Sequence, residues 1–428
     1  MPKPLRLNAP LLPALVGLLV VLQVLDPSTV WKTLLVFLGG AWLLGYLWAR
    51  GLARGLRLER EMRYGWAQVG DELEERFTLE NNSVFPATWA EIEDFSTLPG
   101  YQASLATLVG SSGLTELTTH GQCSRRGLYI LGGARLKSGD PLGIYTVSLE
   151  YPASQTLLVL PPVVPLPNLE VAPGGFSGEG RPRSHSPEQT VRAAGVREYQ
   201  PGDAWRLIHW PTTARRNKPF IRLLEGTPAA DWWLLLDLEA AVQVGSGWDS
   251  TEEHAIVLAA SLADRALRQR KAVGLAVNAA AADWLAPREG EPQRWQILRS
   301  LALARPGSLS LKNFLERSAQ TFGQRSSLVV ITSNVSTEWA EALAPYRWRG
   351  IVPTVLLVDP AGFGGSTQGA GLAAQLAQLG VDCQLISRDL LDRPEAHPGQ
   401  RGRWEWRVSV TGKVVPIHKP DTDWRSLA

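Results

Sequence analysis

The sequence predicts a chain of three parts: an N-terminal hairpin of two transmembrane helices, a β-rich sandwich-like domain, and an α/β domain with a Rossmann-like parallel sheet. Three observations lead to this prediction: two apolar runs near the N-terminus, short strands broken by Gly and Pro turns, and apolar strands that alternate with helices beyond residue 231. A chain of 428 residues is too long for one ordinary domain, and 45% hydrophobic with 20% charged residues is a globular composition.

The first part contains two apolar runs separated by a short polar link. Residues 11–25 carry no charge, and residues 30–48 carry only Lys32 near one end. A helix needs ~20 apolar residues to cross a hydrocarbon core of about 30 Å, so we expect membrane helices at about 10–25 and 30–49. A cleaved signal peptide explains the first run but not the second. A buried helical pair of a soluble protein would show a polar stripe that neither run has.

Charges on either side of the runs predict the orientation. Basic residues precede the first run and follow the second, whereas only Asp26 in the link and Lys32 just beyond it are charged between them. Because cytoplasmic flanks are enriched in Lys and Arg, we expect a multi-pass protein of the inner (cytoplasmic) membrane, with the bulk and both termini in the cytoplasm. The flanking basic residues are Lys3, Arg6, Arg50, Arg54, Arg57 and Arg60.

Changes in composition divide the chain into five segments. Residues 1–57 form the membrane anchor, and 58–162 form the β-rich domain. Residues 163–230 are a linker rich in Pro, Gly and Ser that also contains the signature motif described below. Residues 231–390 form the α/β domain, and 391–428 are a C-terminal tail.

Hydrophobic periodicity distinguishes the two soluble domains. In the β-rich domain, Glu75–Glu80 alternates polar and apolar residues, and turn sequences such as Asp140–Gly143 separate short apolar runs, as is typical of a small β-sandwich. From residue 231, apolar strands alternate with helices, which predicts a parallel sheet covered on both faces. Ser250 and Glu253 form a capping box for the first helix. Strands are predicted at 232–237, 273–277, 327–332, 352–358 and 382–386.

The most distinctive segment runs from Val196 to Arg215. Its Pro-Gly pair suits the centre of a type II turn, and Asp203 is well placed to cap a short helix with Arg206 and His209 on one face. Such a cluster can lock the segment onto the α/β domain, bind an anion or exchange protons, but the motif contains no Ser or Cys nucleophile, so we assign no catalytic residue. The signature and interaction motif comprises Arg197, Tyr199, Pro201, Gly202, Asp203, Arg206, His209, Trp210, Ala214 and Arg215.

Together with Asp140-Pro141-Leu142-Gly143 and Arg126-Gly127-Leu128-Tyr129, the signature resembles the bacterial family called domain of unknown function fifty-eight. The resemblance covers nearly the whole chain, and the parts follow the same order. It implies an α/β domain similar to von Willebrand factor A. It also implies a genomic neighbourhood of MoxR-type AAA+ ATPases and transglutaminase-like membrane proteins, but no defined reaction.

Von Willebrand factor A-like domains that bind Mg²⁺ use an Asp-x-Ser-x-Ser motif after the first strand, with Thr and Asp from later loops. The corresponding residues here, 237–241, read Asp-Leu-Glu-Ala-Ala, so Asp237 is present but Glu239 and Ala241 replace the two serines. Mg²⁺ requires near-octahedral oxygen ligation, and alanine supplies no oxygen from its side chain. We therefore predict a degenerate site at Asp237 and Glu239, with no metal and no other cofactor.

These observations favour a membrane-anchored scaffold or adaptor over an enzyme. The formal net charge of +2 argues against nucleic acid as a partner, because such affinity rests on an excess of Lys and Arg. The expected partners are the cytoplasmic membrane and, by the family resemblance, a MoxR-type AAA+ ATPase. Two alternatives stay open: a hydrolase that uses Asp203, Arg206 and His209, and a metal-dependent protein-binding module.

Overall fold

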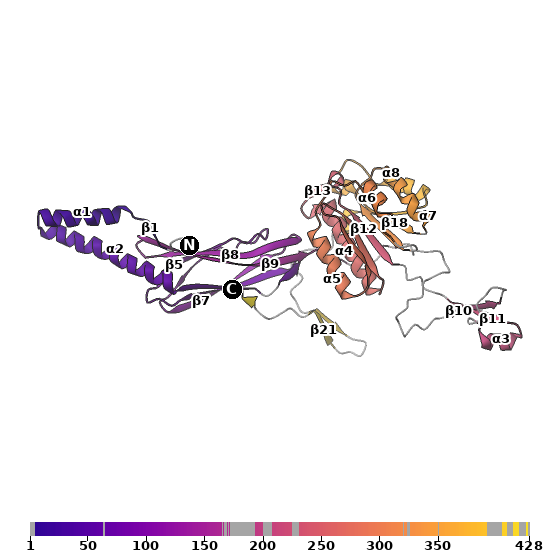
Figure 1. Cartoon of the computed structure of the whole chain (residues 1–428), viewed down its shortest axis with the longest axis horizontal. Coiled ribbons are helices and arrows are strands. Elements are labelled where there is room, and N and C mark those ends of the chain that lie inside the picture. Colours follow the sequence, from indigo (N-terminus) through magenta and orange to yellow (C-terminus); the bar gives the residue numbers. More distant parts are fainter. Residues whose placement is uncertain are drawn as a thin grey trace. The chain divides into compact units, whose positions relative to one another are not determined.

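The computed structural model divides the chain into two compact units, and each is described by itself (Figure 1). The first unit comprises Met1–Leu160 with Ala396–Ala428, and the second comprises Pro161–Glu395. The structure describes residues 5–62, 65–164, 166, 169, 171, 193–199, 208–224, 231–319, 321–322, 326–349, 351–391, 405–408, 414–418 and 425–426.

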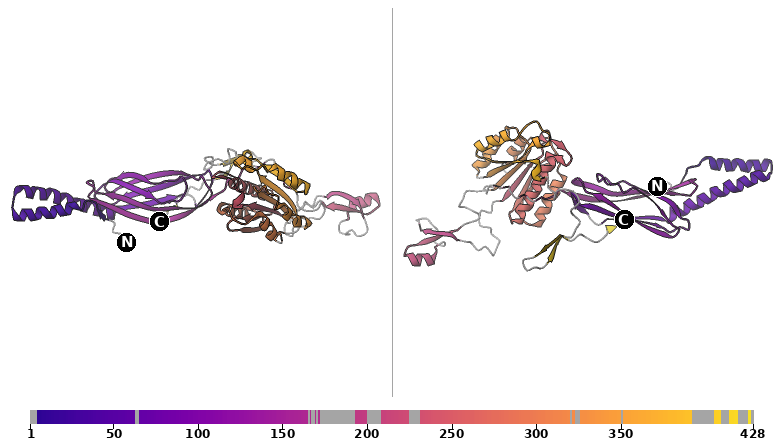
Figure 2. Two further views of the ribbon diagram at one scale, coloured as in Figure 1. Left: turned by 90° about the horizontal axis from the view of Figure 1, so that it is seen from above. Right: turned by 180° about the vertical axis from the view of Figure 1, so that it is seen from behind.

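The first unit begins with an edge strand and a helical hairpin. Strand β1 (Leu5–Leu7) pairs antiparallel with β9 (Tyr145–Leu160). Helices α1 (Leu11–Leu25) and α2 (Thr29–Gly55) follow and lie side by side (Figure 2). Within the described ranges, α2 is the one helix long and apolar enough to cross a membrane, whereas α1 has 15 residues.

The predicted limits of the anchor were wrong at two places. Strand β1, which precedes α1, belongs to the β-rich domain, and α2 continues from the predicted end at 49 to Gly55. The extension is packed rather than free, because Ala49 and Leu52 are fully buried and the Trp48 indole donates a hydrogen bond to the Pro86 carbonyl at 3.0 Å. The helix therefore passes without a break from its exposed apolar part into the β-rich domain.

The β-rich domain contains two sheets. One has the order β1-β9-β8-β5-β6, with β3 pairing on β9, and the other has the order β22-β2-β4-β7. The prediction of a β-rich domain is confirmed, and the tail contributes β22 to the second sheet as well as a separate hairpin of β20 and β21. The remaining strands are β2 (Leu56–Met62), β3 (Trp66–Gln68), β4 (Glu72–Asn81), β5 (Ala87–Asp94), β6 (Leu105–Val109), β7 (Gly113–Gln122), β8 (Gly127–Gly139), β20 (Glu405–Val408), β21 (Val414–His418) and β22 (Arg425–Ser426).

A buried ion cluster joins the two sheets. The Arg60 guanidinium on β2 contacts the Glu75 carboxylate on β4 at 2.6 Å and the Asp94 carboxylate on β5 at 2.7 Å. Tyr101 donates a hydrogen bond to Glu75 and also contacts Thr119. Because β5 lies in the other sheet, the guanidinium ties the two layers together.

The second unit is built on a six-stranded sheet with the order β16-β15-β12-β17-β18-β19. All neighbouring pairs are parallel except β15 and β16, so the predicted parallel sheet gains an antiparallel edge strand that was not predicted. The five predicted strands are present. The bounds are β12 (Trp232–Asp237), β15 (Val273–Asn278), β16 (Asp283–Arg288), β17 (Ser327–Thr332), β18 (Val352–Val358) and β19 (Asp382–Ile386).

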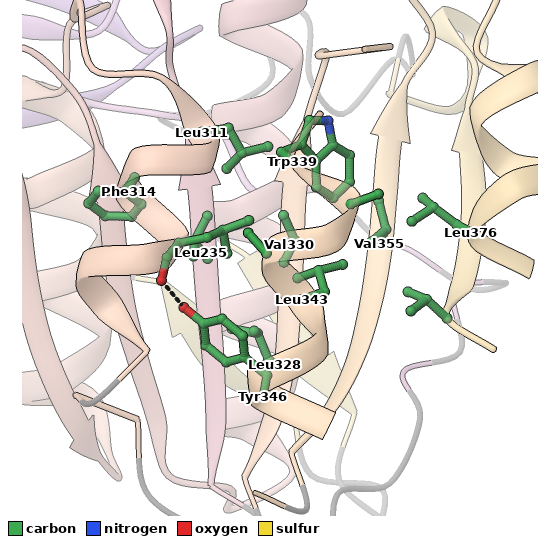
Figure 3. Packing of buried hydrophobic residues seen from close by; sticks show 14 of the residues in the cluster. Leu235, Leu311, Phe314, Leu328, Val330, Trp339, Leu343, Tyr346, Val355 and Leu376 are labelled. Atoms are coloured by element: carbon green, nitrogen blue, oxygen red, sulfur yellow. Dashed lines mark hydrogen bonds between the residues drawn. The ribbon is translucent and has the colours of Figure 1, made fainter. Parts of the chain in front are cut away.

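Helices cover both faces of this sheet (Figure 2). On one face, alternate strand residues such as Leu235, Val330 and Val355 pack against Trp339 and Tyr346 (Figure 3). The opposite face carries α4, whose N-cap Ser250 accepts a hydrogen bond from the Glu253 N–H as the capping box requires. The helices are η2 (Ala240–Val242), α4 (Thr251–Arg268), α5 (Glu291–Leu303), α6 (Leu311–Ser318), η3 (Ala340–Leu343), α7 (Ala344–Trp348), η4 (Pro360–Phe363), α8 (Ala370–Gln378) and α9 (Arg388–Leu391); a short hairpin of β13 (Gly245–Ser246) and β14 (Asp249–Ser250) precedes α4.

The start of the second unit lies against α4. The N–H of Val164 donates to the Ser261 hydroxyl at 2.9 Å, and the Arg265 guanidinium donates to the carbonyls of Leu166 and Leu169, both at 2.8 Å. These bonds satisfy polar backbone groups of a segment that belongs to no helix or strand. The start of the linker, at Val164, Leu166 and Leu169, is therefore attached to the α/β domain.

Candidate functional site

The strand order places a topological switch point between β12 and β17. In order of appearance the strands read 3-2-1-4-5-6, so the chain progresses to one side of β12 first and to the other side afterwards. Open α/β sheets of this order bind ligands beyond the carboxyl ends of the strands at such a point. The residues that end these two strands are Asp237 and Thr332, and they define the candidate site.

Asp237 is fully buried and is held by three donors. Its Oδ2 accepts from the Thr332 hydroxyl at 2.7 Å, and its Oδ1 accepts from the Asn278 amide at 2.8 Å and from the Glu239 N–H at 3.1 Å. The donors come from β17, from β15 and from the loop after β12. The carboxylate therefore joins three neighbouring strands at the edge of the sheet.

Glu239 continues this network toward α6. Its Oε2 accepts from the N–H of Leu311, the first residue of α6, at 3.1 Å and from the Asn334 amide at 3.5 Å. The Asn334 N–H in turn donates to the Thr332 hydroxyl at 2.9 Å. An acid near a helix N-terminus interacts favourably with the helix dipole and with its free N–H groups. Glu239 thus links the N-terminus of α6 to the switch point through a hydrogen bond.

Burial controls the acidity of this site. Removal of Asp237 from water raises the pKa of its carboxyl to about 6, and the hydrogen bonds from Thr332, Asn278 and the Glu239 N–H oppose the rise. The nearby charge of Glu239 raises the pKa further. Desolvation is the largest of these causes.

The side chains at the switch point do not fit a Mg²⁺ ion. Both Asp237 oxygens and Glu239 Oε2 accept hydrogen bonds from protein donors, and Asn278 turns its NH₂ group, not its oxygen, toward Asp237. Ala241 supplies no side-chain oxygen at the position of the second serine. Mg²⁺ requires oxygen ligands in near-octahedral geometry, which these donors do not provide. The arrangement is a hydrogen-bonded joint between strands.

The described part of the signature motif forms a hairpin with a short helix. Strand β10 (Ala193–Glu198) pairs antiparallel with β11 (Phe220–Leu224), and α3 (Trp210–Arg216) lies between them in the sequence. The His209 N–H donates to the Phe220 carbonyl at 2.7 Å, and the His209 ring Nδ1 contacts the Thr212 hydroxyl at 2.8 Å. His209 therefore connects the start of α3 to β11.

The structure corrects the prediction that His209 belongs to the helix capped by Asp203; the rest of that predicted helix, up to residue 207, lies outside the described residues. His209 is the N-cap of α3, with φ −90° and ψ 85°, so it precedes that helix and is not itself helical. Pro211 lies in the first turn of α3, where proline is favoured. The helix also contains Ala214 and Arg215 of the signature motif. Trp210 is 67% exposed, and the Tyr199 N–H donates to the Pro219 carbonyl. Arg197 pairs with Ile221 in the hairpin; Pro201, Gly202, Asp203 and Arg206 lie outside the described residues.

A second surface of the α/β domain was not foreseen from the sequence. Trp348, the last residue of α7, is 85% exposed, and Leu379, just after α8, is 46% exposed. The Arg347 guanidinium donates to the Leu379 carbonyl, so the ends of α7 and α8 meet. We call Trp348, Leu379 and the joining Arg347 the α7–α8 surface. A lone tryptophan in a sequence does not reveal its exposure, which explains the omission.

The described chain is a doubly wound α/β domain preceded by a β-rich domain and a long apolar helix. The model of the family described as "Protein of unknown function DUF58" matches residues 195–363, which run from the signature to the end of η4 after β18. This match confirms the family resemblance drawn from the signature motif.

Relatives of the chain were found in two bacterial genera. The uncharacterized protein YeaD of Bacillus subtilis (strain 168) is 27% identical over 291 residues, which cover 63% of this chain and 70% of YeaD. The uncharacterized protein Rv1480 of Mycobacterium tuberculosis (strain ATCC 25618 / H37Rv) is 25% identical over 170 residues, which cover 38% of this chain. The match spans about half of the mycobacterial relative, 54% of its length.

Solved structures resemble parts of the chain. An aerotolerance-related membrane protein from Bacteroides fragilis NCTC 9343 has a TM-score of 0.29 and 20% identity, and the match covers 37% of this chain and 90% of that one. A von Willebrand factor type A protein from Catenulispora acidiphila has a TM-score of 0.26 and 9% identity, and the match covers 39% of each chain.

Proposed function

We propose that this protein is a membrane-anchored adaptor whose α/β domain binds a protein partner on the cytoplasmic side of the membrane. The observation that carries the proposal is the α7–α8 surface, where Trp348 is 85% exposed. Tryptophan is enriched among the residues that dominate binding energy at protein interfaces, so an exposed Trp348 suits contact with a protein partner. The hydrogen-bonded joint at Asp237 supports a binding role that needs no metal.

Two α-helices that cross the membrane in opposite directions form the proposed anchor. Strand β1 precedes α1 and pairs with β9, while the end of α2 packs on the β4–β5 loop of the same domain. If α2 crosses a bilayer, α1 must cross back, because both outer ends of the hairpin are attached to one domain. This geometry supports a two-pass anchor.

Positive charge supports the cytoplasmic orientation. Arg50, Arg54 and Arg57 are exposed at the end of the hairpin that joins the β-rich domain. The sequence analysis counted Arg60 among these flanking charges. The structure excludes it from them, because Arg60 is buried in the ion cluster with Glu75. Exposed arginines beside membrane helices favour the cytoplasmic side.

A MoxR-type AAA+ ATPase is the proposed partner, on the basis of the family resemblance. The test is affinity purification of the full chain from detergent-solubilised membranes, with co-purifying proteins identified and quantified by mass spectrometry. We expect the ATPase to be recovered with the wild-type chain and its recovery to fall about tenfold or more in Trp348→Ala, since hot-spot truncations cost about 2 kcal/mol or more.

Trp295→Ala provides the matched control. Trp295 lies on α5 and is 37% exposed, so this variant removes an equal side chain from another helix of the same domain. Recovery of the ATPase should be unchanged in the control. If Trp348→Ala recovers as much partner as Trp295→Ala, the α7–α8 surface is not the binding surface; if no protein partner is recovered with any variant, the adaptor proposal fails.

A further inference from the structure

The turn between β8 and β9 lies beside the base of the helical hairpin. A Cβ atom added at Gly45 of α2 would lie 3.5 Å from the Asp140 carboxyl carbon and 3.4 Å from the Ile144 side chain. The Asn8 N–H, just before α1, donates to the Ile144 carbonyl at 2.8 Å. The turn Asp140–Ile144 is therefore level with Asn8 and Gly45, where the helices leave the β-rich domain.

This level lies within the uncharged part of α2. The stretch between Lys32 and Arg50 contains no charged residue and measures about 27 Å at 1.5 Å per residue, while a bilayer core is about 30 Å thick. The membrane therefore has to include the whole stretch. Gly45 precedes Arg50 by about 7.5 Å along the helix axis. The β8–β9 turn, which contacts Gly45, is thus drawn to the depth of the lipid boundary.

The length of α1 leads to the same conclusion. Its 15 residues span only about 22 Å, roughly 8 Å less than the hydrocarbon core. A short span is accommodated when flanking parts of the protein enter the interface or the bilayer thins. The aromatic side chains at the base of the hairpin suit an interface, since the Trp42 indole donates to the Tyr145 hydroxyl at 2.7 Å and Tyr46 packs edge-to-face on Tyr145.

The N–H groups of the turn have hydrogen-bond partners within the protein. Asp140 is 1% exposed, and its carboxylate accepts from the N–H groups of Leu142, Ile144 and Tyr145. The backbone carbonyl of Asp140 accepts from the Gly143 N–H. Satisfied N–H groups lower the cost of placing a loop at the boundary of a medium poor in water. The tip presents Leu142, which is 68% exposed.

We propose that the Asp140–Ile144 turn inserts into the membrane, with the Leu142 side chain at the boundary between lipid headgroups and acyl chains. The inference rests on the proposed two-helix anchor and assigns a role to the Asp-Pro-Leu-Gly motif. The inserted turn is a third contact beside α1 and α2. It fixes the β-rich domain against the bilayer instead of leaving it to pivot on the helices.

The test measures the depth of single nitroxide labels in the full chain, reconstituted into vesicles of phosphatidylcholine and phosphatidylglycerol. Cysteines are introduced in a Cys383→Ser background; Cys123 stays unlabelled because it is buried and burial raises the pKa of its thiol to about 12. We expect a label at Leu142→Cys to favour collision with oxygen over a water-soluble nickel chelate, at a depth of roughly 5–10 Å.

Leu128→Cys is the matched control, because Leu128 is 55% exposed near the other end of β8, about 36 Å along the strand from Gly139. Its label should collide freely with the nickel chelate. Phe37→Cys reports on the anchor itself, since Phe37 is 72% exposed on α2. Pro141→Cys repeats the measurement at the turn should Leu142→Cys fold poorly.

The outcomes separate the two proposals. A label in lipid at residue 37 with labels in water at residues 141 and 142 overturns the inserted turn and leaves the anchor intact. A label in water at residue 37 overturns the anchor. Lipid contact at residues 37 and 142 but not at 128 supports both.

Discussion

Asp237 shows how a position suited to a metal ligand can serve as a structural joint. Its carboxylate accepts from Thr332, Asn278 and the Glu239 backbone, and Glu239 extends the network to the first turn of α6. Both Asp237 oxygens and Glu239 Oε2 accept from donors, which is the condition for burying a polar group at low cost. Asn278 Oδ1, in contrast, is buried and has no hydrogen-bond partner in the described part of the chain.

The buried carboxyl makes stability depend on pH in an unusual direction. Burial raises the pKa of Asp237 from an ordinary 3.8 to about 6. Below about pH 4 both the folded and unfolded states hold the proton; between about pH 4 and 6 the unfolded chain loses it first. The contribution of Asp237 to the free energy of unfolding should therefore fall as pH rises through this window, by on the order of 3 kcal/mol.

The measurement is the melting temperature of the α/β domain within the full chain, from pH 4 to 7.5, for wild type and Asp237→Asn. The neutral isostere cannot ionise, so its advantage over wild type should grow as pH rises. Asp382→Asn is the control, because it removes a carboxylate from an exposed position on β19 and leaves the buried Asp237 in place. Parallel profiles for Asp237→Asn and wild type would show that Asp237 does not carry the effect.

At the scale of elements, α2 is fixed to the β-rich domain through a close approach of two backbones. A Cβ added at Gly55 would lie 2.6 Å from the Ser83 backbone nitrogen, and the Asn82 N–H donates to the Gly55 carbonyl at 2.9 Å. Gly55→Ala should therefore displace the β4–β5 loop at a cost of about 1–3 kcal/mol. The expected result is faster hydrogen exchange in peptides covering residues 81–86.

Gly40→Ala is the matched control for this change, since nothing lies within 4 Å of its added Cβ on the same helix. Exchange in the β4–β5 loop should be as slow as in the wild type. An unchanged exchange rate in Gly55→Ala would mean that the loop accommodates the methyl group and that the close approach is not required.

The ion cluster on β2 should be the most sensitive joint between the two sheets. Arg60→Met leaves the Glu75 and Asp94 carboxylates buried without their cation, which typically costs about 3–5 kcal/mol. Unfolding of the full chain in urea, monitored by hydrogen exchange in β2 and β4, should occur at a lower urea concentration than in the wild type. Arg57→Met, on the exposed face of the same strand, is the control and should change the urea midpoint little. Equal shifts of the midpoint in the two variants would contradict a role for the buried cluster.

Sequence periodicity predicted the elements that form long, regular patterns. The strands of the α/β domain are those expected, because runs such as Trp232–Asp237 are buried on both faces and are wholly apolar until their last residue. Strand β1 was missed because three residues are too few to show a hydrophobic period. Strand β16 was missed because it is an edge strand with no fully buried residue, so it lacks the apolar run of the other strands. The partners of Asp237 were missed because Asn278 is brought beside it only by the parallel register of β12 and β15.

At the scale of the whole molecule, the adaptor proposal depends on both ends of the hairpin lying on the same side of the membrane. The link between α1 and α2 is the one part of the hairpin predicted to face outward, and Ser28 lies in it as the N-cap of α2. A cysteine there should react with a membrane-impermeant maleimide in intact cells. The reaction of Leu128→Cys in the β-rich domain should require that the cells be lysed.

The experiment uses the Cys383→Ser background and compares labelling before and after lysis. Labelling of Ser28→Cys alone in intact cells is expected, because positive charge holds the exposed Arg50, Arg54 and Arg57 inside. Labelling of Leu128→Cys alone would invert the topology and place the α7–α8 surface where no cytoplasmic ATPase reaches it. Labelling of both from outside would show that α1 and α2 do not cross the membrane, and the adaptor would then lose its anchor as well as its partner.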